Sequence, residues 1–147
     1  MLRHIEAAAL VAVLPISSAI AATPVSFDEL TKHPQHYNGR IVEVTAWLQV
    51  DTADTIASLR PRPHVEMSDL PEIFVDCPRW LSDARIYASA DHRVRITGRF
   101  EYRKLTRKLI SPARGNTPGI EELTRGFGWM GIFDKQLTNV SEFTVLR

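Results

Sequence analysis

Residues 40–50 read Arg-Ile-Val-Glu-Val-Thr-Ala-Trp-Leu-Gln-Val, with an apolar residue at every second position from Val42 to Val50. Polar residues occupy most positions between them, although Ile41 and Trp47 interrupt this second series. A period of two residues means that successive side chains lie on opposite faces of an extended chain. The stretch therefore predicts a β-strand with one buried face.

The same period returns in residues 92–103, His-Arg-Val-Arg-Ile-Thr-Gly-Arg-Phe-Glu-Tyr-Arg, which predict a second long strand. A third strand is expected at Ile73–Cys77, between Pro71 and Pro78. We expect further strands at Gly126–Phe133 and Leu137–Leu146, and a short one at Thr55–Leu59. The chain is thus rich in strands of moderate length.

Short helices are expected between the strands. Ser26 followed by Glu29 forms a capping-box pattern, and the helix it begins must end near His33, because Pro34 disfavours a helical residue before it. Apolar residues at helical spacing predict a second helix at Arg79–Ala88. Ile120–Arg125 is interpreted as one helical turn.

These elements predict an all-β domain with short helices, spanning residues 23–147. Four or five strands with one helix in mid-chain fit a small, closed or partly open, five-stranded antiparallel barrel of the OB (oligonucleotide/oligosaccharide-binding) type, with Gly98 as a candidate bend. A β-sandwich is the alternative.

Residues 1–22 have the organisation of a secretory signal peptide. Arg3 precedes the unbroken apolar run Ala7–Leu14, and Ala19-Ile20-Ala21 forms a small-x-small cleavage site. A membrane helix needs roughly 20 apolar residues, whereas Ala7–Ala21 supplies only 15 and contains Pro15. We therefore expect cleavage, a periplasmic or secreted protein and no transmembrane segment in the mature chain.

The composition excludes several classes of protein. The 147 residues contain 18 Lys and Arg against 17 Asp and Glu, a net charge of +1, which argues against a surface that is basic throughout. A single cysteine excludes a disulfide scaffold and a thiolate-caged metal centre. Cys77 is expected to be a buried small hydrophobe, with a reactive or intermolecular thiol as the alternative.

Several short segments of the chain resemble segments of a known group of proteins. They are residues 27–30 (Phe-Asp-Glu-Leu), His33-Pro34, residues 37–40 (Tyr-Asn-Gly-Arg), residues 94–100 and residues 128–133 (Gly-Trp-Met-Gly-Ile-Phe). Together with the alternating strand at residues 42–48 and with residues 137–140, they resemble small, mostly uncharacterised secreted bacterial proteins with OB-like barrels. The resemblance implies a fold and a compartment but no activity. Trp129 stands where that group often has a histidine.

Charge is unevenly distributed along the chain. Residues 23–78 hold four Lys and Arg against nine Asp and Glu, whereas residues 79–147 hold 13 against seven. The most basic block runs from Arg93 to Arg114, in which Arg93, Arg95, Arg99 and Arg103 share strand parity and predict one exposed row. The expected ligand-binding residues are these four with Lys104, Arg107 and Lys108, and with Trp47 and Trp129 as ring surfaces. A solvated face neutralised by Glu43 or Asp76 is the alternative.

The sequence contains no nucleophile elbow, phosphate-binding glycine loop or zinc-binding His-Glu-x-x-His motif. We therefore expect a binding or envelope-accessory module without catalytic residues, metal or cofactor. Its expected partner is an anionic small molecule, a glycan, a lipid head group or an acidic protein, rather than nucleic acid. The alternatives are a structural or protein-partner role of a barrel edge and, third, a hydrolase of unrecognised type.

Overall fold

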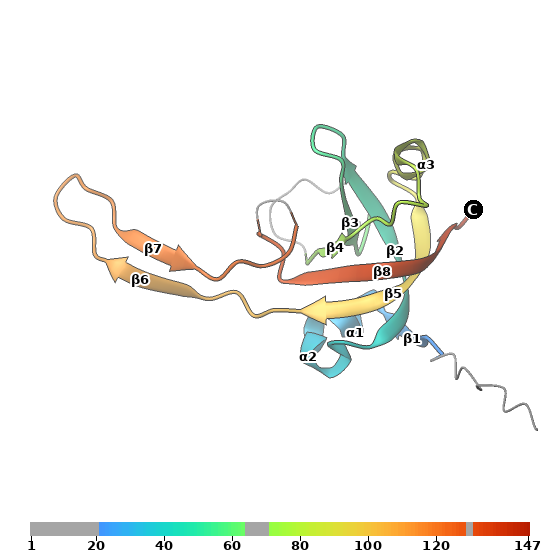
Figure 1. Cartoon of the computed structure of the whole chain (residues 1–147), viewed down its shortest axis with the longest axis horizontal. Helices are drawn as coiled ribbons and strands as arrows, with labels where there is room; N and C mark the ends of the chain where they lie inside the picture. Colours follow the sequence, from blue (N-terminus) through green and yellow to red (C-terminus); the bar gives the residue numbers. More distant parts are fainter. Residues whose placement is uncertain (1–20, 64–70, 129–130) are drawn as a thin grey trace, which may run out of the picture.

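The structure is a computed structural model that describes residues 21–63, 71–128 and 131–147. Five strands close into a barrel (Figure 1). In their order around the barrel, they are β2 (Ile41–Asp51), β3 (Ile56–Arg60), β4 (Ile73–Val75), β8 (Lys135–Val145) and β5 (Arg93–Tyr102), which pairs again with β2. The predicted small all-β barrel is confirmed.

The pairing pattern agrees with an OB-like barrel. All neighbouring barrel strands are antiparallel except β4 and β8, which run parallel through Phe74 and Val75. Along the sequence, the short helix α3 (Asp83–Ala88) lies between β4 and β5, the third and fourth barrel strands, as expected. An additional strand, β1 (Thr23–Ser26), pairs in parallel with the first part of β2 and was not predicted.

The barrel core consists of the inward-facing side chains of strands in which apolar and polar residues alternate. Val42, Val44 and Leu48 of β2 are almost fully buried, as are Val94, Ile96 and Phe100 of β5. Gly98 lies where the register between β5 and β8 shifts, and a Cβ there would meet the carbonyl oxygen of Thr138 at 3.0 Å. Close approach of β8 therefore accounts for the glycine expected at a bend.

The helices follow their capping signals. Helix α1 (Phe27–Lys32) begins after Ser26, whose hydroxyl accepts a hydrogen bond from the Glu29 amide at 3.1 Å. A second short helix, α2 (Pro34–Tyr37), follows, because proline fits the first turn of a helix. Helix α3 begins later than predicted, at Asp83 after the N-cap Ser82.

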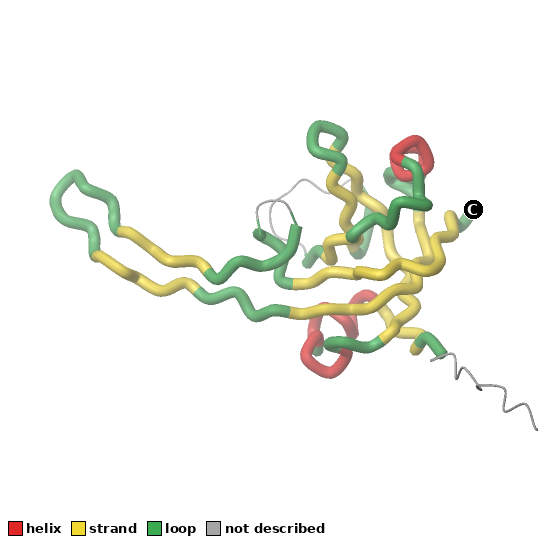
Figure 2. The backbone as a smooth tube through the Cα atoms, viewed as in Figure 1, coloured by secondary structure: helices red, strands yellow, loops and turns green. Residues whose placement is uncertain are grey.

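Two predictions for residues 120–133 are wrong. The segment expected to form a helical turn contains a strand, β7 (Ile120–Leu123), which pairs with β6 (Arg107–Ser111). The strand expected at residues 126–133 is reduced, in its described part, to one bridge between Phe127 and Phe133, because Gly128 and Gly131 have positive φ and turn the chain. Figure 2 shows the described residues of this stretch as a loop.

Of the predicted signal peptide, residues 1–20 lie outside the described residues, as does Trp129. Within the described ranges, none of the helices has the length and apolar character needed to cross a bilayer.

Candidate anion-binding surface

The basic arm, residues 103–125, projects from the barrel between β5 and β8 (Figure 1). Strands β6 and β7 form its two-stranded sheet, separate from the barrel sheet. Figure 2 shows that the arm extends well beyond the body of the barrel. The arm therefore presents its side chains to the surroundings rather than to the core.

Positive charge is concentrated in the basic arm. It contains six basic residues and two acidic ones, and all eight side chains are exposed: Arg103, Lys104, Arg107, Lys108, Arg114, Arg125, Glu121 and Glu122. One loose ion pair joins Arg107 to Glu121 at 3.8 Å, with the arginine 78% exposed. Such an exposed pair contributes little and is screened by salt, so it offsets little of the positive charge of the arm.

The arm also exposes aliphatic side chains among its basic ones. Leu109, Ile110 and Ile120 are each more than half exposed, and Leu105 at the base of the arm is 38% exposed. Exposed apolar groups gathered on one element mark an interaction surface more often than scattered ones do. The arm thus combines cationic groups with apolar ones.

The base of the arm is fixed by Arg103. Its guanidinium donates to the carbonyl of Arg125 at 2.9 Å and lies over the ring of Phe127. Its amide donates to the carbonyl of Asp134 at 2.8 Å. Arg103 therefore has a positioning role at the base in addition to its charge.

The predicted row of four arginines is only partly formed. Arg93, Arg95 and Arg99 lie exposed on the outer face of β5, but the strand ends at Tyr102, so Arg103 belongs to the arm. Arg95 lies 4.0 Å from a Glu43 oxygen, and Arg99 donates to the Gly39 carbonyl at 3.4 Å. The row is a set of three arginines, of which Arg95 and Arg99 have local partners.

Carboxylates from the neighbouring strands lie on the same outer face. Glu43 of β2 and Glu142 of β8 are both in register with Thr97, and Glu142 accepts a hydrogen bond from its hydroxyl at 3.3 Å. Glu101 of β5 itself accepts a hydrogen bond from Gln136 at 2.6 Å. The contact between Arg95 and Glu43 supports the alternative that Glu43 neutralises this face. Asp76, the other carboxylate considered, instead accepts a hydrogen bond from the Thr138 hydroxyl. The positive excess lies in Lys104, Arg107 and Lys108 on the arm.

Trp47 lies on the outer face of β2, half-buried and in register with Arg93 on one side and Arg60 on the other. It is on the barrel wall and not on the arm. Its ring therefore lies beside the β5 arginines, as the sequence suggested, but apart from the arm lysines.

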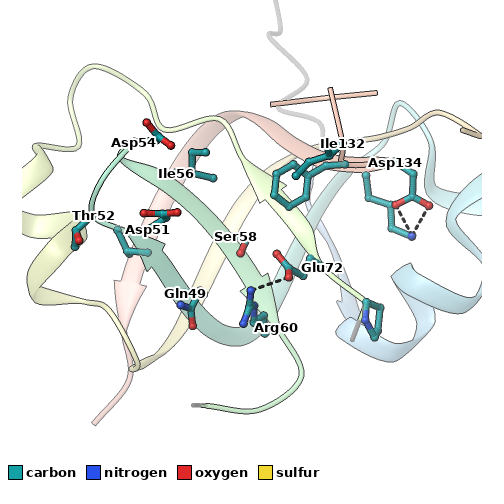
Figure 3. A pocket seen from close by; sticks show the side chains of 14 residues that line it. Gln49, Asp51, Thr52, Asp54, Ile56, Ser58, Arg60, Glu72, Ile132 and Asp134 are labelled. Carbon is teal, nitrogen blue, oxygen red and sulfur yellow. Dashed lines mark hydrogen bonds and ion pairs between the residues drawn. The ribbon is translucent and has the colours of Figure 1, made fainter. Parts of the chain in front are cut away.

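A groove that the sequence did not predict lies over β2 and β3 (Figure 3). Its volume is about 660 Å³, and Gln49, Ser58, Arg60 and Glu72 are among its lining residues. One signal could have pointed to it, because Arg60 directly follows the mostly apolar stretch Ile56–Leu59. In the structure this arginine is only 4% exposed. A buried arginine requires a charged partner, which the fold supplies in Glu72.

Cys77 is half-buried and packs against the core cluster. Burial, with additional repulsion from the charges of Asp76 and Asp83, raises the pKa of its thiol from 9.0 to about 11. The thiol is therefore protonated at neutral pH and a weak nucleophile. Within the described ranges, no group of three or more His, Cys, Asp or Glu side chains is arranged to hold a metal ion.

Comparison of the chain with protein-family models, with curated proteins and with solved structures found no match. The function must therefore be inferred from the charges and contacts of the chain itself.

Proposed function

We propose that the protein is a non-catalytic binding module that captures an anionic ligand with its basic arm. The observation that carries the proposal is the arm itself: a projecting hairpin with six basic and two acidic residues, all exposed. Guanidinium groups bind phosphate and carboxylate in a bidentate manner, and lysines add point charges. The β5 arginines contribute less, because Glu43 and Glu142 lie beside them.

Among anionic ligands, a surface of phosphate-bearing lipids fits the arm best. The exposed Leu109, Ile110 and Ile120 lie on the same two strands as Arg107 and Lys108. Apolar side chains enter the boundary between head groups and acyl chains, while basic residues remain at the phosphates. A soluble glycan or small anion would use the charges but leave the aliphatic groups in water.

The expected signal peptide supports this choice of ligand. A protein delivered to a bacterial periplasm or to the exterior meets anionic lipids and rarely meets nucleic acid. Expression of the full chain with its first 22 residues, followed by mass measurement of the secreted product, tests the expectation. A product that retains residues 1–22 would contradict it.

A second candidate is a protein partner that adds a strand to the arm. In the described part of the chain, β6 and β7 pair only with each other, so each has an outer edge with free backbone groups. Such edges accept a further strand from another protein. Strand addition would depend weakly on salt, whereas lipid capture through lysine and arginine would depend on it strongly.

The test is sedimentation of residues 23–147 with vesicles of phosphatidylcholine alone or with added phosphatidylglycerol, at low and high salt. We expect binding to the anionic vesicles only, and its loss at high salt. In the triple variant Lys104→Gln, Arg107→Gln and Lys108→Gln, each lost charge removes about 1 kcal/mol, so binding should weaken roughly a hundredfold.

The matched control combines Arg93→Gln, Arg95→Gln and Arg99→Gln, which also removes three charges, but from the barrel wall, and should weaken binding far less. Equal effects of the two variants, or equal binding to neutral and anionic vesicles, would refute the proposal.

A further inference from the structure

The groove over β2 and β3 is a recess rather than an open sheet surface (Figure 3). Ser58 and Arg60 alternate with the core residues Ala57 and Leu59, so they lie on the outer face of β3. They are nevertheless only 3% and 4% exposed. A volume of about 660 Å³ is within the range of small-ligand sites, roughly 300–1,000 Å³.

The positive charges that line the groove are neutralised inside it. A guanidinium nitrogen of Arg60 lies 2.7 Å from a Glu72 oxygen, and the amine of Lys135 lies 2.7 Å from an Asp134 oxygen. Both cations are less than a tenth exposed. Bound to these carboxylates, they leave little positive charge for an anionic ligand.

Two further carboxylates lie at the end of the groove formed by the β2–β3 turn. Asp51 and Asp54 are exposed, and neither forms an ion pair with another described residue. One Asp51 oxygen accepts a hydrogen bond from the Ala53 amide at 2.9 Å, which fixes the carboxylate and leaves its second oxygen for a ligand. The groove is therefore net negative, the opposite of the basic arm.

The groove also has an apolar wall. Ile56 and Val50 lie on the barrel side, and Ile132 and Phe133 lie on the segment that returns from the arm. The Phe133 ring stacks on Phe74 with centroids 5.4 Å apart, so it is held in place. Ile132 is 59% exposed and available to cover a ligand.

We propose that this groove binds a ligand that joins an ammonium or guanidinium group to an apolar body. The cation would lie against Asp51 and Asp54, and the apolar body against Ile132 and Phe133. Free alkylamines and the basic side chains of peptides share this chemistry. The site is independent of the arm, because its charge has the opposite sign and it uses different residues.

The test records backbone amide shifts of residues 23–147 during titration with octylamine, octanoate and octanol. A parallel titration uses the peptides acetyl-Leu-Lys-Leu-amide and acetyl-Leu-Gln-Leu-amide. We expect the amides of Ile56, Ser58 and Phe133 to shift with octylamine, with the lysine peptide or with both, and to respond much more weakly to the anionic and neutral probes. The probe that binds identifies the source of the cation.

The decisive variant is Asp51→Asn with Asp54→Asn, two exposed positions whose replacement should leave the far-ultraviolet circular dichroism spectrum unchanged. We expect affinity for the cationic probe to fall roughly fivefold or more, the upper range for exposed charge pairs. Glu122→Gln, which removes a carboxylate from the arm, is the control and should have no effect.

Equal binding of octanoate and octylamine, unchanged affinity in the Asn variant, or the absence of any shift with both cationic probes would overturn the proposal. Vesicle binding by the arm is measured separately and does not depend on this outcome.

Discussion

The guanidinium carbon of Arg103 lies 5.0 Å from the centre of the Phe127 ring, across the base of the basic arm. The two residues belong to opposite sides of the hairpin, and the arginine also donates to the Arg125 carbonyl. The contact joins the outgoing and returning segments just where they leave the barrel. It accounts for how a long hairpin keeps a defined exit from the barrel wall.

We predict that Arg103→Ala loosens the arm without unfolding the barrel. An exposed cation–π contact contributes about 0.5–1 kcal/mol, and the lost hydrogen bond adds to this. Amide hydrogen exchange should become faster in β6 and β7 and stay unchanged in β2 and β5. Accelerated exchange throughout the barrel would show that Arg103 supports the whole fold instead.

Leu109→Ser with Ile110→Ser should weaken binding to anionic vesicles while leaving its salt dependence as it is. The reason is that salt screens charge, and this variant keeps every charge of the arm. Both side chains are more than half exposed, so the urea midpoint should change little. Vesicle sedimentation at several salt concentrations measures the effect, and wild-type affinity in the variant would argue for a purely electrostatic ligand.

Glu72→Gln should lower the free energy of unfolding by roughly 1–3 kcal/mol, because it removes a charged partner from a guanidinium that is held out of water. The comparison is Glu121→Gln, which breaks the exposed pair with Arg107 and should cost less than about 0.5 kcal/mol. Urea denaturation at neutral pH measures both. Similar losses in the two variants would mean that burial of Arg60 adds nothing to the strength of its pair.

The Cys77 thiol predicts an alkaline loss of stability. Because its pKa is raised to about 11 in the folded protein, the folded state retains a proton that the unfolded chain releases near 9.0. The contribution of the thiol to the free energy of unfolding is therefore complete below pH 9 and is lost as the pH rises from about 9 toward 11. Urea denaturation with reductant at pH 8 and near pH 10.5 should show a larger decline for the wild type than for Cys77→Ala. Parallel declines would contradict the assignment.

The strands that could be predicted are those in which one face is buried along the whole length. In β2 and β5, every second residue is buried along most of the strand, and their bounds agree with the expectation to within about a residue. β1 has no such pattern, since it is an edge strand of four residues with little burial. β7 contains two glutamates, which favour a helix locally, and becomes a strand only because β6 pairs with it.

The candidate site could be predicted only in part, for a related reason. Parity along one strand placed Arg93, Arg95 and Arg99 on one face. Glu43 was expected as a carboxylate that could neutralise this face, but Glu142 was not, because it reaches the face through pairing of β5 with the distant strand β8, which no local pattern reveals. The groove likewise combines three separate stretches of the chain, so only the closed barrel brings it into existence.

The position of the arm has a consequence for how this fold could change. Tyr102 and Lys135 flank the arm together with the segment that returns from it, and they face each other as a register pair of β5 and β8. A tight turn could therefore join them directly and leave the barrel pairing complete. An equivalent barrel could therefore gain, lose or exchange this insertion, and with it the ligand preference of the arm, while the pairing of β5 with β8 stays the same.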